Sequence, residues 1–291
     1  MEVISLQSGS SGNCIYVESD GVRLLFDAGI SGRQAEQRLA QHGKDIRQVD
    51  ALIISHDHRD HTACMGIFHR KYGLPIHITR PTLKATRRGM KLGVVNDIRH
   101  FRSQESLTFK HLTVETIPTP HDAADGVAFV IDDQSKRFGL LTDLGHVFDD
   151  LPKVMPTLDA VLLESNYDDE MLASSDYPEF LKDRISGPEG HISNLDAAQL
   201  LRDHAGPRLQ WACLAHLSDE NNCPHVALET HRQILGDSIQ IECADRLAAS
   251  SIMHVSDFHD GFSEPPAANA RLTNKRRQSK PVQQAFVWNE A

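Results

Sequence analysis

A cluster of metal-binding side chains directly follows an apolar segment early in the chain. Residues 51–54 have the composition of a buried β-strand and lead at once into His56, His58, Asp60 and His61. Three histidines and a carboxylate within six residues have the density of a metal site. The alternatives are a solvated loop with a chance cluster and a mononuclear structural site. A metal site requires that the end of this strand lie beside further ligands.

Further candidate ligands follow other strand-like segments. Residues two apart point the same way in an extended backbone, so His56 and His58 can share one ion while Asp60 and His61 face a second. Sites in α/β sheets assemble at the carboxyl ends of strands. The residues at such ends are His121, Asp143, His216 and Asp27. Taken singly, each is equally compatible with an ordinary loop.

The order of segments predicts the fold class. Short strand-like segments and helix-forming segments alternate over residues 1–263, which predicts an α+β fold with two mixed β-sheets and helices packed outside them. Helices are expected at 33–42, 62–72, 81–92, 193–203 and 224–235. Residues 264–291 are basic and poor in apolar side chains, so we expect a flexible tail there.

Composition excludes several classes of protein. The 291 residues carry a formal net charge of −10, and no apolar run approaches the 18 or so residues of a membrane helix. The N-terminus does not resemble a secretory leader. The five cysteines never form a C-x-x-C spacing, which favours reduced thiols. We therefore expect a cytoplasmic protein with no membrane partner; the oligomeric state is not readable from sequence.

Several short motifs occur one after another along the chain. They are S-G-S-S-G-N at 8–13, L-F-D-A-G at 25–29, E-S-N at 164–166, G-H-I-S-N at 190–194, and H-L-S at 216–218 followed by N-N-C-P. With the histidine cluster, these motifs resemble the metallo-β-lactamase-fold hydrolases, and within them the YycJ/WalJ-type branch. The resemblance extends to about residue 244.

This resemblance implies a fold, a ligand set and a nucleophile. The family fold is a four-layer αβ/βα sandwich. One metal ion would take His56, His58 and His121, the second would take Asp60, His61 and His216, and Asp143 would bridge them. Asp27 would orient the ligand loop. Two divalent ions, Zn²⁺, Mn²⁺ or Fe²⁺, would hold a metal-bridging hydroxide as nucleophile.

Catalytic and substrate-binding residues are expected around these metals. Asp60 and His191 are the expected catalytic residues, with His191 giving a proton to the leaving group; an ordinary loop hydrogen bond is the alternative for His191. The expected substrate-binding residues are Ser11, Asn13, Asn166, His146, Lys84, Arg87 and Arg88. Residues 70–102 hold nine Lys and Arg against one acid, although a solvated helix face has the same pattern.

Three functions are compatible with this sequence. The first is a phosphodiesterase acting on nucleic acid, DNA more than RNA, because the resembling branch is linked to 5′ to 3′ exonuclease activity on DNA. The alternative is a small-molecule hydrolase acting on a cyclic phosphodiester, phosphonate ester, thioester or lactone with the same metal centre. The third is a metal-stabilised binding module without turnover. Asp143 stands where many true β-lactamases of the superfamily carry Cys or Ser, which disfavours antibiotic hydrolysis.

Overall fold

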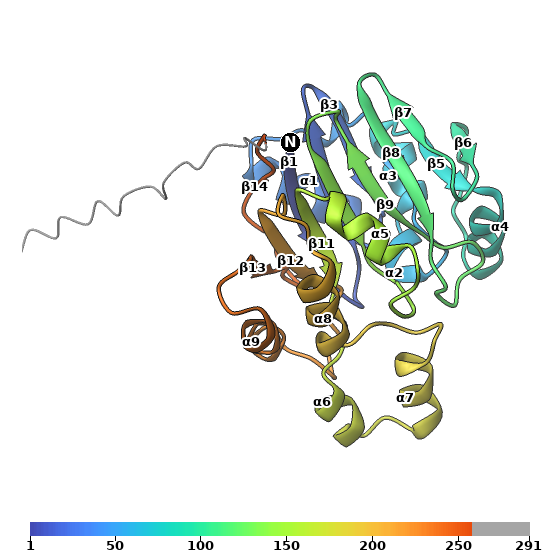
Figure 1. Ribbon diagram of the computed structural model, residues 1–291. Coiled ribbons are helices and arrows are strands. Elements are labelled where there is room, and N and C mark those ends of the chain that lie inside the picture. The colour runs from blue at the N-terminus through green and yellow to red at the C-terminus, as the bar shows by residue number, and fades with distance from the viewer. Residues whose placement is uncertain (258–291) are drawn as a thin grey trace, which may run out of the picture. The chain divides into compact units, whose positions relative to one another are not determined.

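The computed structural model describes residues 1–257, which contain two seven-stranded β-sheets (Figure 1). The first sheet has the strand order β14-β1-β2-β3-β4-β5-β6, antiparallel from β14 to β3 and parallel from β3 to β6. Its strands are β1 Glu2–Gln7, β2 Cys14–Ser19, β3 Val22–Phe26, β4 Ala51–Ile53, β5 Ile76–Thr79, β6 Ile98–Phe101 and β14 Met253–His254.

The second sheet has the order β13-β12-β11-β10-β9-β8-β7 and is also mixed. Strands β10 to β13 pair in parallel, and β7 to β10 pair antiparallel. Its strands are β7 Leu107–Phe109, β8 Leu112–Pro118, β9 Val127–Asp132, β10 Arg137–Leu141, β11 Ala160–Glu164, β12 Trp211–Ala215 and β13 Gln240–Cys243. The predicted two-sheet α+β sandwich is confirmed.

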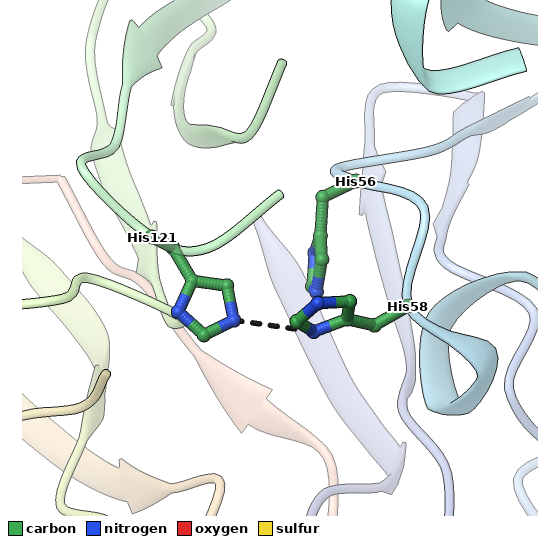
Figure 2. A group of neighbouring side chains, drawn as sticks. All are labelled: His56, His58 and His121. Carbon is green, nitrogen blue, oxygen red and sulfur yellow. Dashed lines mark hydrogen bonds between the residues drawn. The ribbon is translucent and has the colours of Figure 1, made fainter. Parts of the chain in front are cut away.

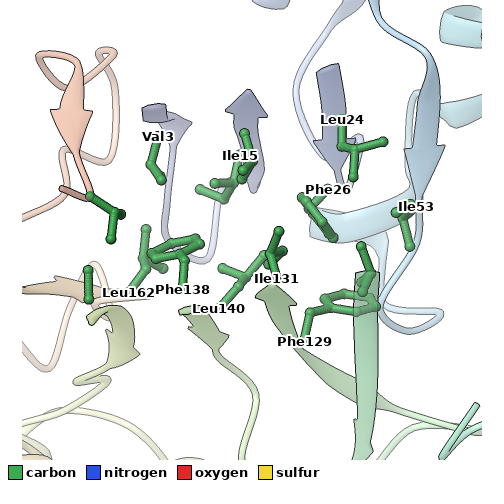
Figure 3. Close-up of a cluster of buried hydrophobic side chains, with 14 of the residues drawn as sticks. Val3, Ile15, Leu24, Phe26, Ile53, Phe129, Ile131, Phe138, Leu140 and Leu162 are labelled. Atoms are coloured by element: carbon green, nitrogen blue, oxygen red, sulfur yellow. The ribbon is translucent and has the colours of Figure 1, made fainter. Parts of the chain in front are cut away.

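The core lies between the sheets, and the helices cover their outer faces. Successive strand residues point to opposite faces, so Leu24 and Phe26 enter the inter-sheet core beside Phe129, whereas Leu25 packs under the helices of its own sheet (Figure 3). Burial on both faces explains why these strands read as continuous apolar runs. The sandwich thereby fixes the strand ends, from which the site residues project.

Capping residues set several helix boundaries. Ser31 and Ser193 each form a capping box at the start of a helix, as the sequence predicts for Ser193. Gly73 ends α3 in the left-handed conformation. The helices are α1 Gly32–Gln41, α2 Arg59–Thr62, α3 Met65–Tyr72, α4 Arg80–Gly89, α5 Leu151–Val154, α6 Asp169–Ser174, α7 Glu179–Ser186, α8 Asn194–His204 and α9 Pro224–Leu235.

The predicted helix over 62–72 is wrong in its first turn. The carbonyls of Asp60 and His61 accept hydrogen bonds from the backbone of Asn13 and Ala28, at 2.8 and 2.7 Å. These carbonyls are therefore not available to a continuing helix, and the chain breaks between α2 and α3. The predicted helix over 81–92 likewise ends early, at Gly89, because Met90 is extended and Leu92 turns into the core.

Some elements are not predicted by the sequence, and one prediction falls outside the described residues. Strands β6, β13 and β14 and helices α6 and α7 are short or half-exposed, and their sequences lack a clear period. The predicted tail at 264–291 and the predicted domain end at residue 263 lie beyond residue 257. Within residues 1–257, no helix has the length and apolar character needed to cross a bilayer.

Candidate metal centre

The loop after β4 carries four candidate ligands and turns sharply, so that the four side chains point in two directions. His56 and His58 lie in extended backbone, with His58 just before α2, while Asp60 and His61 belong to that single helical turn. Gly29 permits the close approach of the neighbouring loop, because a Cβ atom there would lie 1.6 Å from the carbonyl oxygen of Asp60. The backbone thus presents ligands to both sides of one point.

Three histidines form the first ligand group (Figure 2). His56 and His58 come from the loop after β4, and His121 follows β8 in the opposite sheet. The His121 Nε2 atom lies 3.2 Å from His58 Nδ1, and one ring nitrogen from each of the three lies within 4.8 Å of the others. The loops of two sheets therefore bring three nitrogen ligands to one point.

The second group combines a carboxylate with two histidines. Asp60 Oδ2 lies 3.3 Å from His61 Nε2 and 3.4 Å from His216 Nε2. His216 follows β12, so this group also joins the two sheets. The two sets of three that the family resemblance assigns to two metals are thus each brought together, and they overlap with two further groups, His56, His61 and Asp143, and Asp143, Glu164, His191 and His216.

Asp143 lies between the two groups. Its Oδ1 atom is 4.0 Å from His56 Nε2 and 3.4 Å from His216 Nε2, and its Oδ2 atom is 3.5 Å from His61 Nε2. The φ angle of Asp143 is 58°, and that of His216 is 56°. Left-handed backbone is uncommon for residues other than glycine, and the surrounding structure holds it at these two strand ends.

The donor set fits divalent cations. The buried atoms His56 Nε2 and Asp143 Oδ2 have no hydrogen-bond partner among the described residues, although burying an unsatisfied polar atom is costly. Imidazole nitrogens with carboxylate oxygens suit Zn²⁺, Mn²⁺ and Fe²⁺. The metal-ligand candidates therefore form a set that a cation would complete.

Burial and neighbouring charges shift the pKa values of the residues in the cluster. Burial would raise the pKa of Asp60, but the His61 charge and a hydrogen bond from His216 outweigh it and hold that pKa well below its usual range. Burial would lower the pKa of His216, yet Asp143 and Asp60 raise it to about 10. Burial lowers the pKa of His56. His216 thus favours a proton where a cation would bind, and metal binding would release it.

The candidate ligand histidines are held through their second nitrogen atoms. His61 Nδ1 lies 2.8 Å from Asp27 Oδ2, and the Ser55 hydroxyl donates to the same carboxylate. His121 Nδ1 lies 2.7 Å from the carbonyl oxygen of Gly190. Such contacts fix the ring orientation and the tautomer of a ligand histidine.

Two asparagines support the ligands from behind. The Asn13 amide lies 3.2 Å from Asp60 Oδ2, and its oxygen accepts from the backbone of Gly9. Asn166 donates to the carbonyl oxygen of His216 at 2.8 Å. Both asparagines are buried, so the structure places them against ligand residues and not on the cavity wall where substrate was expected.

Glu164 belongs to the E-S-N motif at 164–166, but the sequence assigns no role to it. It is 0% exposed, and its Oε1 atom lies 2.7 Å from His191 Nδ1 and 3.6 Å from His216 Nδ1. Burial would raise the pKa of Glu164, but His191 lowers it to about 2. The available signal was its position at the end of β11, between the strands that carry Asp143 and His216.

A cavity of about 180 Å³ opens over the cluster. His191 lines it, with its ring centre 4.9 Å from that of His121. Ser10 also lines the cavity, whereas the neighbouring Ser11, expected there, does not. His146 is exposed and lies against the carbonyl oxygen of Pro188 instead. The cavity is lined by Ser10, His58, Asp60, His121, Asp122, Asp143, Arg184, Ile185, Gly190, His191 and His216.

The basic residues expected to bind substrate lie on α4. Lys84, Arg87 and Arg88 are exposed, because Thr82, Leu83 and Thr86 form the buried face of this helix. Lys91 lies beyond the end of the helix. In the part of the chain that the structure describes, no carboxylate forms an ion pair with these four cations, whereas nearby Lys71 and Arg99 pair with acidic neighbours.

Comparison with known families and proteins agrees with the fold. A family model described as "Beta-lactamase superfamily domain" matches residues 22–216. The chain is 36% identical to "Exodeoxyribonuclease WalJ" of Streptococcus pneumoniae serotype 2 (strain D39 / NCTC 7466) over 224 residues, covering 76% of this chain and 83% of the relative. It is 32% identical to "Exodeoxyribonuclease YycJ" of Bacillus anthracis over 257 residues, covering 86% and 97%.

Solved structures share the same sandwich. The metallo-β-lactamase fold protein YhfI from Bacillus subtilis has a TM-score of 0.65 at 18% identity, covering 86% of this chain and 98% of YhfI. Zn²⁺-bound PqqB from Methylobacterium extorquens has a TM-score of 0.65 at 17% identity, covering 86% and 100%. At these identities the likeness concerns the fold alone.

Proposed function

The chain belongs to the beta-lactamase superfamily, and from that premise we propose that it is a dinuclear metal-dependent exodeoxyribonuclease. The observation that carries the proposal is the position of the Asp143 carboxylate between two groups of three ligands. The similarity of the chain to exodeoxyribonucleases over most of its length supports DNA as the substrate.

We assign the ligands as the geometry groups them. His56, His58 and His121 would hold one ion, Asp60, His61 and His216 the other, and Asp143 would contact both. Two divalent ions supply a nucleophile from water at neutral pH and neutralise charge on the phosphate undergoing displacement. Zn²⁺ and Mn²⁺ are the first candidates, and Fe²⁺ is the third.

His191 is the proton donor in this proposal. Its Nδ1 atom lies against Glu164, so its Nε2 atom is the ring nitrogen left to give a proton to the departing oxygen of the cleaved strand. The ionised Glu164 carboxylate fixes the ring and stabilises the charged imidazole before transfer. Asn13 and Asn166 act one step further away, by positioning Asp60 and His216.

The α4 residues Lys84, Arg87 and Arg88 are the proposed contacts to the strand backbone. Their charges are unpaired in the described part of the chain, which leaves them free to neutralise phosphates. This local positive face explains how a protein of net charge −10 can bind a polyanion.

Degradation of end-labelled DNA tests the proposed function. Metal-reconstituted protein is incubated with 5′-labelled and 3′-labelled duplex DNA, with labelled RNA, and with a panel of small esters and lactams. We expect directional loss of DNA that Asp60→Ala abolishes and that Asp176→Ala, a change at a carboxylate outside the cluster, leaves intact. Intact DNA together with a hydrolysed small ester would replace the proposal with small-molecule hydrolysis.

A further inference from the structure

Helices α6 and α7 project from the sandwich below the strand ends (Figure 1). None of the eight residues of α7, Glu179–Ser186, is buried. A helix is ordinarily stabilised by burying an apolar face, and α7 keeps Phe180, Leu181 and Ile185 partly or fully exposed. The last turn of this unburied helix nevertheless forms one wall of the cavity over the metal centre, through Arg184 and Ile185.

Arg184 is fixed at that wall by a single carboxylate. Its Nε and Nη2 atoms lie 2.7 and 2.6 Å from Asp122 Oδ2. The other oxygen of Asp122 lies 3.4 Å from His58 Nε2, so this ion pair joins α7 to the first ligand group. Guanidinium carries five N–H donors, and a group held by one edge presents the remaining donors in a fixed direction. The Arg184 side chain is 60% exposed and lines the cavity.

Phe180 lies one helical turn before Arg184 and on the same side of α7, since residues four apart share a helix face. Its side chain is 73% exposed. Along α7, away from the candidate metal centre, the chain therefore offers a cation beside the cavity and then, about 6 Å further along the helix axis, an exposed aromatic ring. Proteins commonly bind single nucleic-acid strands with cations that contact the phosphates and aromatic rings that stack on the bases.

The cavity is too small to enclose both the phosphate and the base of a nucleotide. Its volume of about 180 Å³ is below the roughly 300–1,000 Å³ of pockets that enclose drug-sized ligands. A phosphodiester group fits over the metal ligands, but the base attached to it must lie outside. The wall on which that base would emerge is α7.

We propose that α7 binds the terminal nucleotide of the strand being degraded, with Arg184 donating to its phosphate and Phe180 stacking on its base. This inference rests on the proposed nuclease function and adds the feature that selects a strand end: a terminal base has one face that no neighbouring base covers. A protein partner bound through Phe180 is the competing occupant, and a substrate without a terminal base distinguishes the two.

The test combines a change in the protein with a change in the substrate. Initial rates are measured for wild type, Phe180→Ala and Phe180→Trp on an oligonucleotide with natural ends and on one whose terminal nucleotide at each end is abasic. Val94→Ala is the matched control, because Val94 is 67% exposed and does not line the cavity. Thermal unfolding and sizing chromatography accompany each variant.

Stacking predicts a specific pattern of KM values. Phe180→Ala should raise the KM for the natural oligonucleotide roughly tenfold, while leaving the KM for the abasic one unchanged. Phe180→Trp should restore wild-type KM, and Val94→Ala should have no effect. Equal KM values for wild type and Phe180→Ala on the natural oligonucleotide would overturn the inference, as would an equal rise on both substrates or a changed oligomeric state with unchanged KM. Failure of wild type to degrade either oligonucleotide would instead overturn the nuclease function, and this inference with it.

Discussion

The Asp27 carboxylate lies 2.8 Å from Nδ1 of His61, on the side of the ring opposite the cluster. The same carboxylate accepts from the backbone and hydroxyl of Ser55, immediately before His56. One buried side chain therefore positions both the ring of His61, a proposed ligand, and the start of the loop that carries the proposed ligands. Its φ angle of 63° shows that the backbone adopts a costly conformation to place it there.

Asp27→Asn should weaken metal binding by about 10- to 100-fold, because the neutral amide holds His61 less firmly and makes it a poorer ligand. Asparagine tolerates positive φ, so the backbone should be retained. The measurement is competition with a chelator, read as metal bound per chain. The control is Asp20→Asn, at another aspartate with positive φ, 44°, in the turn between β2 and β3. Unchanged metal affinity in Asp27→Asn would remove Asp27 from the metal centre.

His191→Ala should lower kcat on DNA by about 100-fold or more, since general acid catalysis contributes about 10²–10⁴-fold. A p-nitrophenyl phosphodiester has a leaving group that needs no proton, so on it the same variant should retain nearly wild-type kcat. Glu164→Gln should follow the same pattern with a smaller loss, because it acts only through His191. An equal loss of kcat on both substrates would show that His191 has a role other than proton donation.

Charge reversal at Arg87 and Arg88 should raise the KM for DNA and reduce its salt dependence. Each lost phosphate contact should lower the slope of log affinity against log salt by about 0.7–0.9. Arg202→Glu, an exposed arginine on α8, is the matched control. KM values and slopes that stay at the wild-type level would make the α4 face an ordinary solvated surface.

His77 should make the protein less stable in mild acid. Burial, with the nearby Arg99, lowers the pKa of His77 to about 4, below the value of about 6.5 in an unfolded chain. Its contribution is therefore complete above pH 6.5 and is lost as pH falls toward 4, because the unfolded chain takes up the proton first. His77→Leu should reduce the loss of unfolding free energy between pH 8 and pH 4.5 by about 2 kcal/mol. The exposed His225→Leu should not, and equal pH profiles for His77→Leu and wild type would refute the assignment.

The ends of the strands are the part of the site that the sequence predicts best. His121, Asp143 and His216 each lie within three residues of the end of a strand. Strands that run the same way end at one edge of a sheet, so the convergence of these residues with the loop after β4 is predictable. The helix break after Thr62 is not, because it depends on carbonyls accepting from backbone groups more than 30 residues away. Local patterns contain no information about such long-range partners.

The same reason explains why some residues expected to bind substrate do not line the cavity. Asn13 is polar and lies in a glycine-rich loop, which suits a phosphate contact, but its amide lies against Asp60, 47 residues further along the chain. Arg184 and Phe180 lie in a short helix with no buried residue, so no pattern of core positions draws attention to either. The pairing of Arg184 with Asp122, like that of Asn13 with Asp60, joins residues far apart in the chain.

The number of bound ions that activity requires decides whether this protein is a dinuclear nuclease. Metal-free protein is titrated with Mn²⁺ or Zn²⁺, and bound metal per chain is measured alongside degradation of labelled DNA. We expect little degradation at one equivalent and full activity only as the second ion binds, because the two ligand groups share Asp143. Full activity with a single bound ion, or none with two, would contradict a dinuclear nuclease.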